Sequence, residues 1–187
     1  PAEVPAEPVG GVRFQVQGLL DRRRFETFHI DVGWGDRLLE PVETLATPAL
    51  LSFANIPPTE IPSYPLTQQI AEKVHAYTRP RATGEGSRVK DMVDILLIAE
   101  LRPMHGQALA QALQATFDTR TTHALPLHLP DPPSAWAAPF RRLAEETGRG
   151  YQTLTDASEA AQRFLDPVLR GETFGLWDPM TWSWQPL

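Results

Sequence analysis

The chain has 187 residues, of which 42% are hydrophobic and 21% charged, so it can bury one core and is not wholly disordered. It contains no cysteine, which excludes disulfides, thiolate catalysis and cysteine zinc sites and makes the cytoplasm the expected compartment. The net charge of −6 predicts no broad basic surface for nucleic acid, although a local basic patch stays open. No apolar run is long enough to predict a membrane span.

The first third of the chain predicts β-structure. Residues 1–11 are rich in proline and lack periodicity, which is typical of a linker or a truncated end. Apolar and polar side chains then alternate over residues 12–20 and again over 25–33, with a charged turn between them. This period of two predicts a β-hairpin with one apolar face.

Residues 41–65 contain six prolines, and only one or two short strands are expected there, at 50–53 and 61–64. From Leu66 the apolar period becomes helical. Helices are expected from Leu66 to the stop at Arg79-Pro80, from 88 to 101 with Ser87 as N-cap, and at 106–117, 135–147 and 156–170. The predicted class is α+β, with a β-rich part at 12–65 and a helical part at 66–187.

The predicted helix at 88–101 is the most informative segment, because it is apolar nearly all round and should therefore be buried. Asp91 and Asp94 lie three residues apart on it, on one face. A buried carboxylate without a partner is strongly unfavourable. These two acids therefore require a cation from the protein, a metal ion or a polar cavity.

Lys73, on the preceding helix, and Arg88, three residues before Asp91, are the candidate cations. The short connection predicts that the two helices pack together, so we expect a Lys73–Asp91 pair at the edge of a cavity. Spacing alone favours a structural ion pair at a helix–helix interface over a catalytic role, because structural networks perturb acids as active sites do.

Asp31 lies near the end of the second predicted strand and shares a face with His29. A carboxylate in this position can supply an oxygen ligand to Mg²⁺. The pattern alone favours the simpler interpretation, a solvated aspartate on an exposed face of the sheet.

The C-terminal tail contains Trp177, Trp182 and Trp184 without a regular period. We expect these side chains to cover a hydrophobic surface rather than to stack on bases. His123 and His128 lie in a proline-rich loop and lack the further ligands that a zinc site needs.

Several segments resemble a known family. FETFHIDVG at 25–33, LTQQIAEKVHAYTRP at 66–80 and SRVKDMVDILLIAE at 87–100 are similar to the nucleotidyltransferase AbiEii/AbiGii toxin family, which is associated with abortive infection and type IV toxin–antitoxin systems. WAAPFRRLAEE at 136–146 and FLDPVL at 164–169 resemble its C-terminal helical region.

The resemblance implies a fold like that of DNA-polymerase-β-type nucleotidyltransferases, a mixed sheet flanked by helices with a helical C-terminal region. It implies a nucleoside triphosphate and Mg²⁺, transfer of a nucleotide to RNA at the acceptor end of tRNA, and a cognate antitoxin. The family's lysine falls on Lys73, with Arg88 as a second nucleotide-binding residue. Its helix-borne aspartates fall on Asp91 and Asp94, and its third strand acid, a metal ligand, on Asp31.

The roles follow from that resemblance. Lys73 would neutralise triphosphate charge, and Asp91 would orient Lys73 or assist proton transfer. Asp94 would brace its helix through Lys90 or Arg88.

One family motif is not found in the printed sequence: a Gly-Ser pair followed about ten residues later by Asp-x-Asp. We therefore expect the chain to be the C-terminal part of the enzyme and to transfer no nucleotide in isolation. The alternatives are a non-catalytic module that binds RNA or an antitoxin, and a structural domain without a ligand. The gene sequence upstream of codon 1 distinguishes the enzyme from the binding module.

Overall fold

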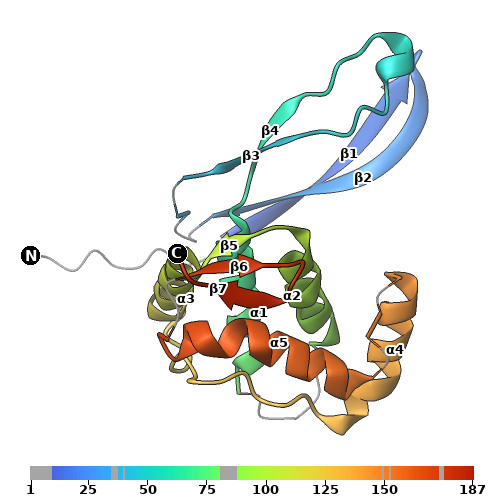
Figure 1. Cartoon of the computed structure of the whole chain (residues 1–187). Helices are drawn as coiled ribbons and strands as arrows, with labels where there is room; N and C mark the ends of the chain where they lie inside the picture. Colours follow the sequence, from blue (N-terminus) through green and yellow to red (C-terminus); the bar gives the residue numbers. More distant parts are fainter. Residues whose placement is uncertain are drawn as a thin grey trace, which may run out of the picture. The chain divides into compact units, whose positions relative to one another are not determined.

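The computed structural model divides the chain into two compact units, residues 1–38 and 39–187 (Figure 1). It describes residues 10–34, 38–39, 41–80, 88–148, 150–151, 153–172 and 175–187. Most of the expected linker at 1–11 and the expected N-cap Ser87 lie outside these residues, whereas Gly10 and Gly11 already belong to the first strand.

The first unit contains the predicted hairpin, made of β1 (Gly10–Leu20) and β2 (Arg23–Trp34) in antiparallel pairing. The register places Phe14 opposite Ile30, so the apolar residues of both strands share one face, as their alternation predicts. Asp21 and Arg22 have φ angles of 48° and 62°. Positive φ at both central residues forms the type I′ turn whose twist matches that of the strands.

The second unit begins with another antiparallel pair, β3 (Glu43–Ala46) and β4 (Glu60–Ser63). The structure confirms the strand expected at 61–64, and the strand expected at 50–53 is wrong. That stretch turns and forms a 3₁₀ helix, Ser52–Ala54, because the Ala54 N–H donates to the Leu51 carbonyl three residues back at 2.9 Å. No sequence signal predicted β3.

Five α-helices lie in the described part of the second unit, and all five were predicted. They are α1 (Leu66–Thr78), α2 (Val89–Leu101), α3 (Gly106–Arg120), α4 (Ala137–Glu146) and α5 (Leu154–Leu169). With the strands they confirm the α+β class. None of the helices in the described residues is long and apolar enough to cross a membrane.

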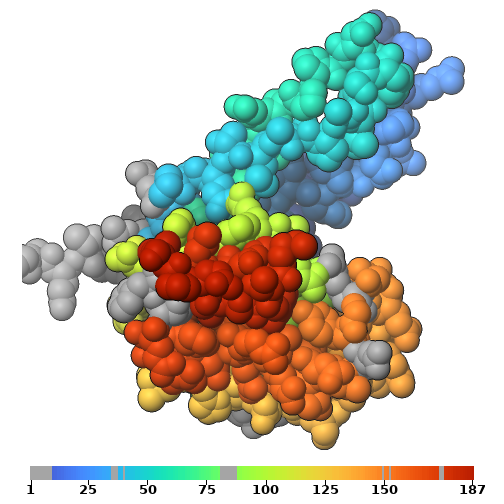
Figure 2. All heavy atoms as spheres, viewed as in Figure 1, coloured from blue at the N-terminus to red at the C-terminus, as the bar shows by residue number. Residues whose placement is uncertain are grey.

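The buried core lies among these helices, with α1 packed against both α2 and α3. A three-stranded sheet in the order β5-β6-β7 closes it, made of Met104–His105, Leu176–Asp178 and Ser183–Gln185. Trp177 on β6 is fully buried. In Figure 2 the C-terminal segment, in red, lies over α5, in orange. The tail thus covers a hydrophobic surface, as expected.

The β3–β4 pair belongs to the same unit as the helices and is tied to them by Glu43. This carboxylate accepts the Leu66 N–H at the start of α1 at 3.1 Å and forms an ion pair with Arg102 just after α2. The domain boundary expected at residue 65 stays a prediction.

Candidate functional site

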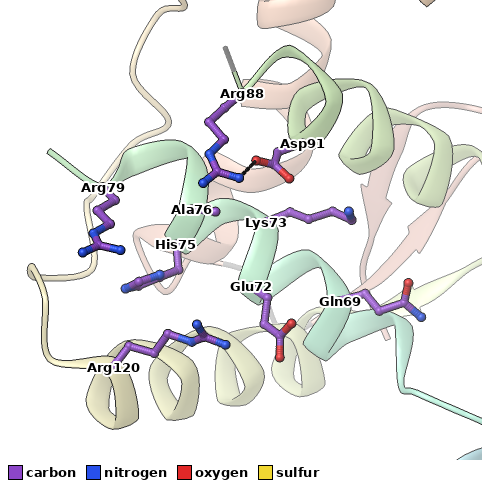
Figure 3. A pocket seen from close by; sticks show the side chains of 9 residues that line it. All are labelled: Gln69, Glu72, Lys73, His75, Ala76, Arg79, Arg88, Asp91 and Arg120. Atoms are coloured by element: carbon purple, nitrogen blue, oxygen red, sulfur yellow. Dashed lines mark hydrogen bonds and ion pairs between the residues drawn. The ribbon is translucent and has the colours of Figure 1, made fainter. Parts of the chain in front are cut away.

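A cavity of about 480 Å³ lies against α1, the start of α2 and the end of α3 (Figure 3). Its size is in the range of small-molecule sites. Three of the sequence-predicted residues, Lys73, Arg88 and Asp91, line it together. The full lining is Gln69, Glu72, Lys73, His75, Ala76, Arg79, Arg88, Asp91 and Arg120.

The ion pairs on the α2 side differ from those predicted. Lys73 Nζ lies 2.6 Å from Asp94 Oδ2, and Arg88 Nη1 lies 3.3 Å from Asp91 Oδ2. The expected Lys73–Asp91 pair is therefore wrong, as is the expectation that Asp94 pairs with Lys90 or Arg88. Asp94 instead holds the lysine ammonium.

The reason lies in how α1 and α2 run. They are consecutive helices of opposite direction in Figure 3, so residues at equal distances from the connection meet. Lys73 lies five residues before the last residue of α1, and Asp94 lies five residues after the first residue of α2. Asp91 lies in the first turn of α2 and therefore meets the end of α1, where Ala76 also lines the cavity.

Asp91 has the less exposed carboxylate of the two, with 16% of its side chain accessible against 42% for Asp94. Its position in the first turn of α2 is favourable for a negative charge, because the partial positive charge of the helix dipole lies there. Arg88 supplies the neutralising cation, which meets the requirement that a largely buried acid has a partner.

A chain of hydrogen bonds holds His75 in one neutral form. The Thr78 hydroxyl donates to the Val74 carbonyl at 2.9 Å, so it must accept from Nε2–H of His123 at 2.8 Å. The other ring nitrogen of His123 then accepts from the Thr122 hydroxyl at 3.0 Å. Because the single hydroxyl proton of Thr122 is donated to His123, its oxygen accepts from Nε2–H of His75 at 2.7 Å.

The surroundings of His75 also oppose its protonation. Burial, followed by the nearby His123, Arg120 and Arg79, lowers the pKa of His75 to about 4. Burial and Arg79 lower the pKa of His123 as well. His75 is therefore a neutral imidazole at the cavity wall over the physiological pH range.

This shift predicts a loss of stability in acid. The folded pKa of His75, about 4, lies below its ordinary value of 6.5, so the stabilisation is complete above pH 6.5 and is lost as the pH falls toward 4. Linkage gives a loss of about 2 kcal/mol in the free energy of unfolding between pH 7 and pH 5. Urea unfolding at pH 7, 6 and 5 measures it.

The matched variant is His75→Gln, because glutamine can donate a hydrogen bond to Thr122 and does not titrate. We expect the pH dependence of this variant to be shallower than that of the parent chain over the same range. Identical slopes would show that His75 is not the group responsible.

Asp31, the expected metal ligand, lies on β2 in the first unit. Arg13 opposite it donates to both carboxylate oxygens, at 2.6 and 2.8 Å, and lowers the pKa of Asp31. Asp31 would therefore have to release Arg13 before it could join the octahedral oxygen shell of Mg²⁺. The described residues also contain no group of three His, Asp or Glu side chains that could hold a metal.

Sequence reasoning missed three residues at the far end of the cavity, His75, Arg79 and Arg120. In Figure 3 their side chains lie on the side of α1 from which Lys73 points away. In the sequence, the Arg79-Pro80 pair indicates only the end of a helix. Arg120 comes from α3, and its approach to α1 depends on tertiary packing that no local pattern signals.

Comparison with known proteins agrees with the resemblance in the sequence. Residues 1–173 match the family model described as "Nucleotidyl transferase AbiEii toxin, Type IV TA system". No curated protein matches the chain. The match covers most of the 187 residues, and the chain therefore belongs to the AbiEii nucleotidyltransferase toxin family of type IV toxin–antitoxin systems.

Proposed function

We propose that this chain is part of a nucleotidyltransferase toxin that transfers a nucleotide from a nucleoside triphosphate to a hydroxyl of RNA, with tRNA as the acceptor and pyrophosphate as the leaving group, at the cavity between α1, α2 and α3. The observation that carries the proposal is that Lys73 and Asp91, the two positions matched to the family's functional residues, line one cavity with Arg88. A type IV toxin also implies a cognate antitoxin as partner.

Lys73 is the residue that we propose to meet the triphosphate. An ammonium has three donors, and Asp94 accepts from it at 2.6 Å, which leaves two for phosphate oxygens. Asp94 thus acts as a positioning residue that holds the ammonium at the cavity. Positive charge fixed before the reaction stabilises the charge that develops during phosphoryl transfer.

Asp91 and Arg88 are the second proposed pair. The Arg88 guanidinium is held beside Asp91 at 3.3 Å, and its planar donors suit a phosphate. Asp91 is a candidate to accept the proton of the attacking RNA hydroxyl. Binding of phosphate by Arg88 would weaken its hold on this carboxylate.

Mg²⁺ belongs to the proposal as the metal that nucleotidyltransferase chemistry commonly uses. Among the described residues there is no group of three His, Asp or Glu side chains that could hold a metal ion, so we assign no step to Mg²⁺. Asp31 as a ligand stays a prediction.

The test is an incorporation assay. The full-length gene product is incubated with each of the four radiolabelled nucleoside triphosphates, Mg²⁺ and total tRNA. The 187-residue chain is assayed in parallel under the same conditions. We expect labelled tRNA with the gene product and a loss of at least about tenfold with Asp91→Asn. The same assay checks the expectation that the 187-residue chain is inactive in isolation.

The control is Asp118→Asn, an exposed acid on α3 that does not line the cavity. It should label tRNA at the parent rate. If the gene product binds tRNA but transfers no label under any nucleotide, the non-catalytic binding module is the better description.

A further inference from the structure

The cavity has an end that the proposed transfer does not use, where Arg79 and Arg120 lie near His75. In Figure 3 the side chains of Arg120, from the end of α3, and Arg79, which directly follows α1, lie on the His75 side of α1. The lining carries four cations and two carboxylates, a net positive charge in a chain whose total is −6. Such a concentration against the overall charge favours an anionic ligand at this place.

The ion pairs divide the cavity into two ends. Lys73 and Arg88 are each paired with an aspartate of α2. Arg79, in contrast, has no acidic partner within 4 Å among the residues that the structure describes, and it is exposed. An exposed, unpaired guanidinium at a cavity rim can be reached by a large ligand, and it presents donors that match a phosphate.

The neighbouring groups are neutral hydrogen-bonding ones. The relay through Thr122 leaves His75 with Nε2–H as its donor and with Nδ1 unprotonated. The segment that follows α3 adds the exposed residue Thr121, whereas the Thr122 hydroxyl is already engaged by His75 and His123. Contacts to a nucleic-acid backbone are made by this mixture of arginines and hydroxyl groups.

We infer that Arg79 and Arg120 bind a backbone phosphate of the RNA acceptor, at the opposite end of the cavity from Lys73. The inference rests on the proposed function, because it takes RNA as the acceptor. It assigns the RNA to the end of the cavity at Arg79 and Arg120 and leaves Lys73 and Arg88 to the nucleotide. A chain without a broad basic surface then holds its RNA through a few local charges.

Both arginines also have a structural explanation that the experiment must separate. Arg79 follows the last residue of α1, and Arg120 is the last residue of α3. Cations are favourable at helix C-termini because of the helix dipole. If this were their whole role, their removal would lower stability without affecting RNA.

The experiment measures RNA binding without turnover. Total tRNA with a fluorophore at its 5′ end is titrated with the full-length gene product at several KCl concentrations, with no nucleoside triphosphate present. We expect the double variant Arg79→Gln/Arg120→Gln to bind tRNA about tenfold more weakly. The slope of log K against log[KCl] should fall by about one for each arginine that contacts a phosphate.

The matched control is Arg142→Gln, an exposed arginine on α4 that does not line the cavity. It should leave both affinity and salt slope unchanged. Nucleoside triphosphate binding, measured by calorimetry, should stay within about twofold of the parent value in the double variant. Lys73→Ala should show the reverse pattern, with weaker nucleotide binding and an unchanged RNA salt slope.

Two results with the glutamine double variant would overturn the inference. Parent-like tRNA binding by the double variant would assign the arginines to the helix ends alone, and a loss confined to nucleotide binding would assign them to the triphosphate. If the double variant does not fold, Arg79→Lys/Arg120→Lys decides instead. We expect the lysine variant to keep the salt slope and to bind tRNA about threefold more weakly, because an ammonium lacks the planar paired donors of a guanidinium. Unchanged affinity would contradict the inference.

The outcome is separable from that of the proposed function. Arginine-dependent tRNA binding without any nucleotide transfer would reject the proposed reaction and keep this inference. Transfer to tRNA that does not depend on either arginine would do the opposite.

Discussion

Replacing Lys73 with alanine should lower nucleotide transfer by the full-length gene product at least about a hundredfold. The structure supplies the physical reason, because Lys73 is the cation that Asp94 holds at the cavity, with Nζ 2.6 Å from Oδ2. Removing it deletes the fixed positive charge that we propose to stabilise the transition state.

The same substitution should cost the fold little. The side chains of Lys73 and Asp94 are 24% and 42% exposed, so water screens the ion pair and solvates the aspartate that is left behind. Pairs of this kind contribute at most about 1 kcal/mol. Thermal melting and transfer rate are therefore measured on one Lys73→Ala preparation.

The matched control is Lys90→Ala, an exposed lysine of α2 that does not line the cavity. It should keep the parent rate and melting temperature. A Lys73→Ala protein that melts much earlier, but whose folded fraction transfers nucleotide at the parent rate, would show that the ion pair is only structural.

Replacing Trp177 with alanine should destabilise the second unit by about 3 to 5 kcal/mol. The indole is fully buried, contacts the aromatic rings of Phe164 and Trp184, and donates from Nε1 to the Ala99 carbonyl at the end of α2 at 2.8 Å. Alanine would leave both a large cavity and an unsatisfied buried carbonyl. Chemical denaturation measures the change.

Two further variants separate the contribution of the hydrogen bond from that of the aromatic ring and provide an exposed control. Trp177→Phe keeps an aromatic ring and loses the hydrogen bond, so it should cost less than alanine. Met180→Ala alters a side chain that is 91% exposed in the loop between β6 and β7 and should have almost no effect. A Trp177→Ala protein as stable as the Met180 variant would refute the central position of the tail in the core.

The sequence determined the elements whose stabilising contacts are local. Period-two alternation identified the hairpin of β1 and β2, and period 3.6 identified all five helices, because each period is the geometric repeat of the element itself. The strand expected at 50–53 is wrong because that segment has no such repeat and only its composition suggested a strand. Its apolar composition resembles a strand, but hydrogen bonds within the turn at Leu51 and Ala54 form instead.

In the candidate site, too, the sequence predicted what depends on neighbouring segments and missed what depends on distant ones. The sequence placed Lys73 on one helix and Asp91 on the next, and their short connection was enough to bring both to one cavity. The sequence also predicts the register between the two helices, because consecutive antiparallel helices align residues that are equidistant from their connection. This register pairs Lys73 with Asp94.

Only the tertiary structure brought in the third side of the cavity. Arg120 and Thr122 reach His75 across more than forty positions of sequence, because α3 packs on α1. Trp177 likewise reaches the end of α2 across a separation of 78 positions. Such contacts arise when apolar faces of distant elements are buried together, and the periodicity of one segment reports only that it has such a face, not which partner covers it.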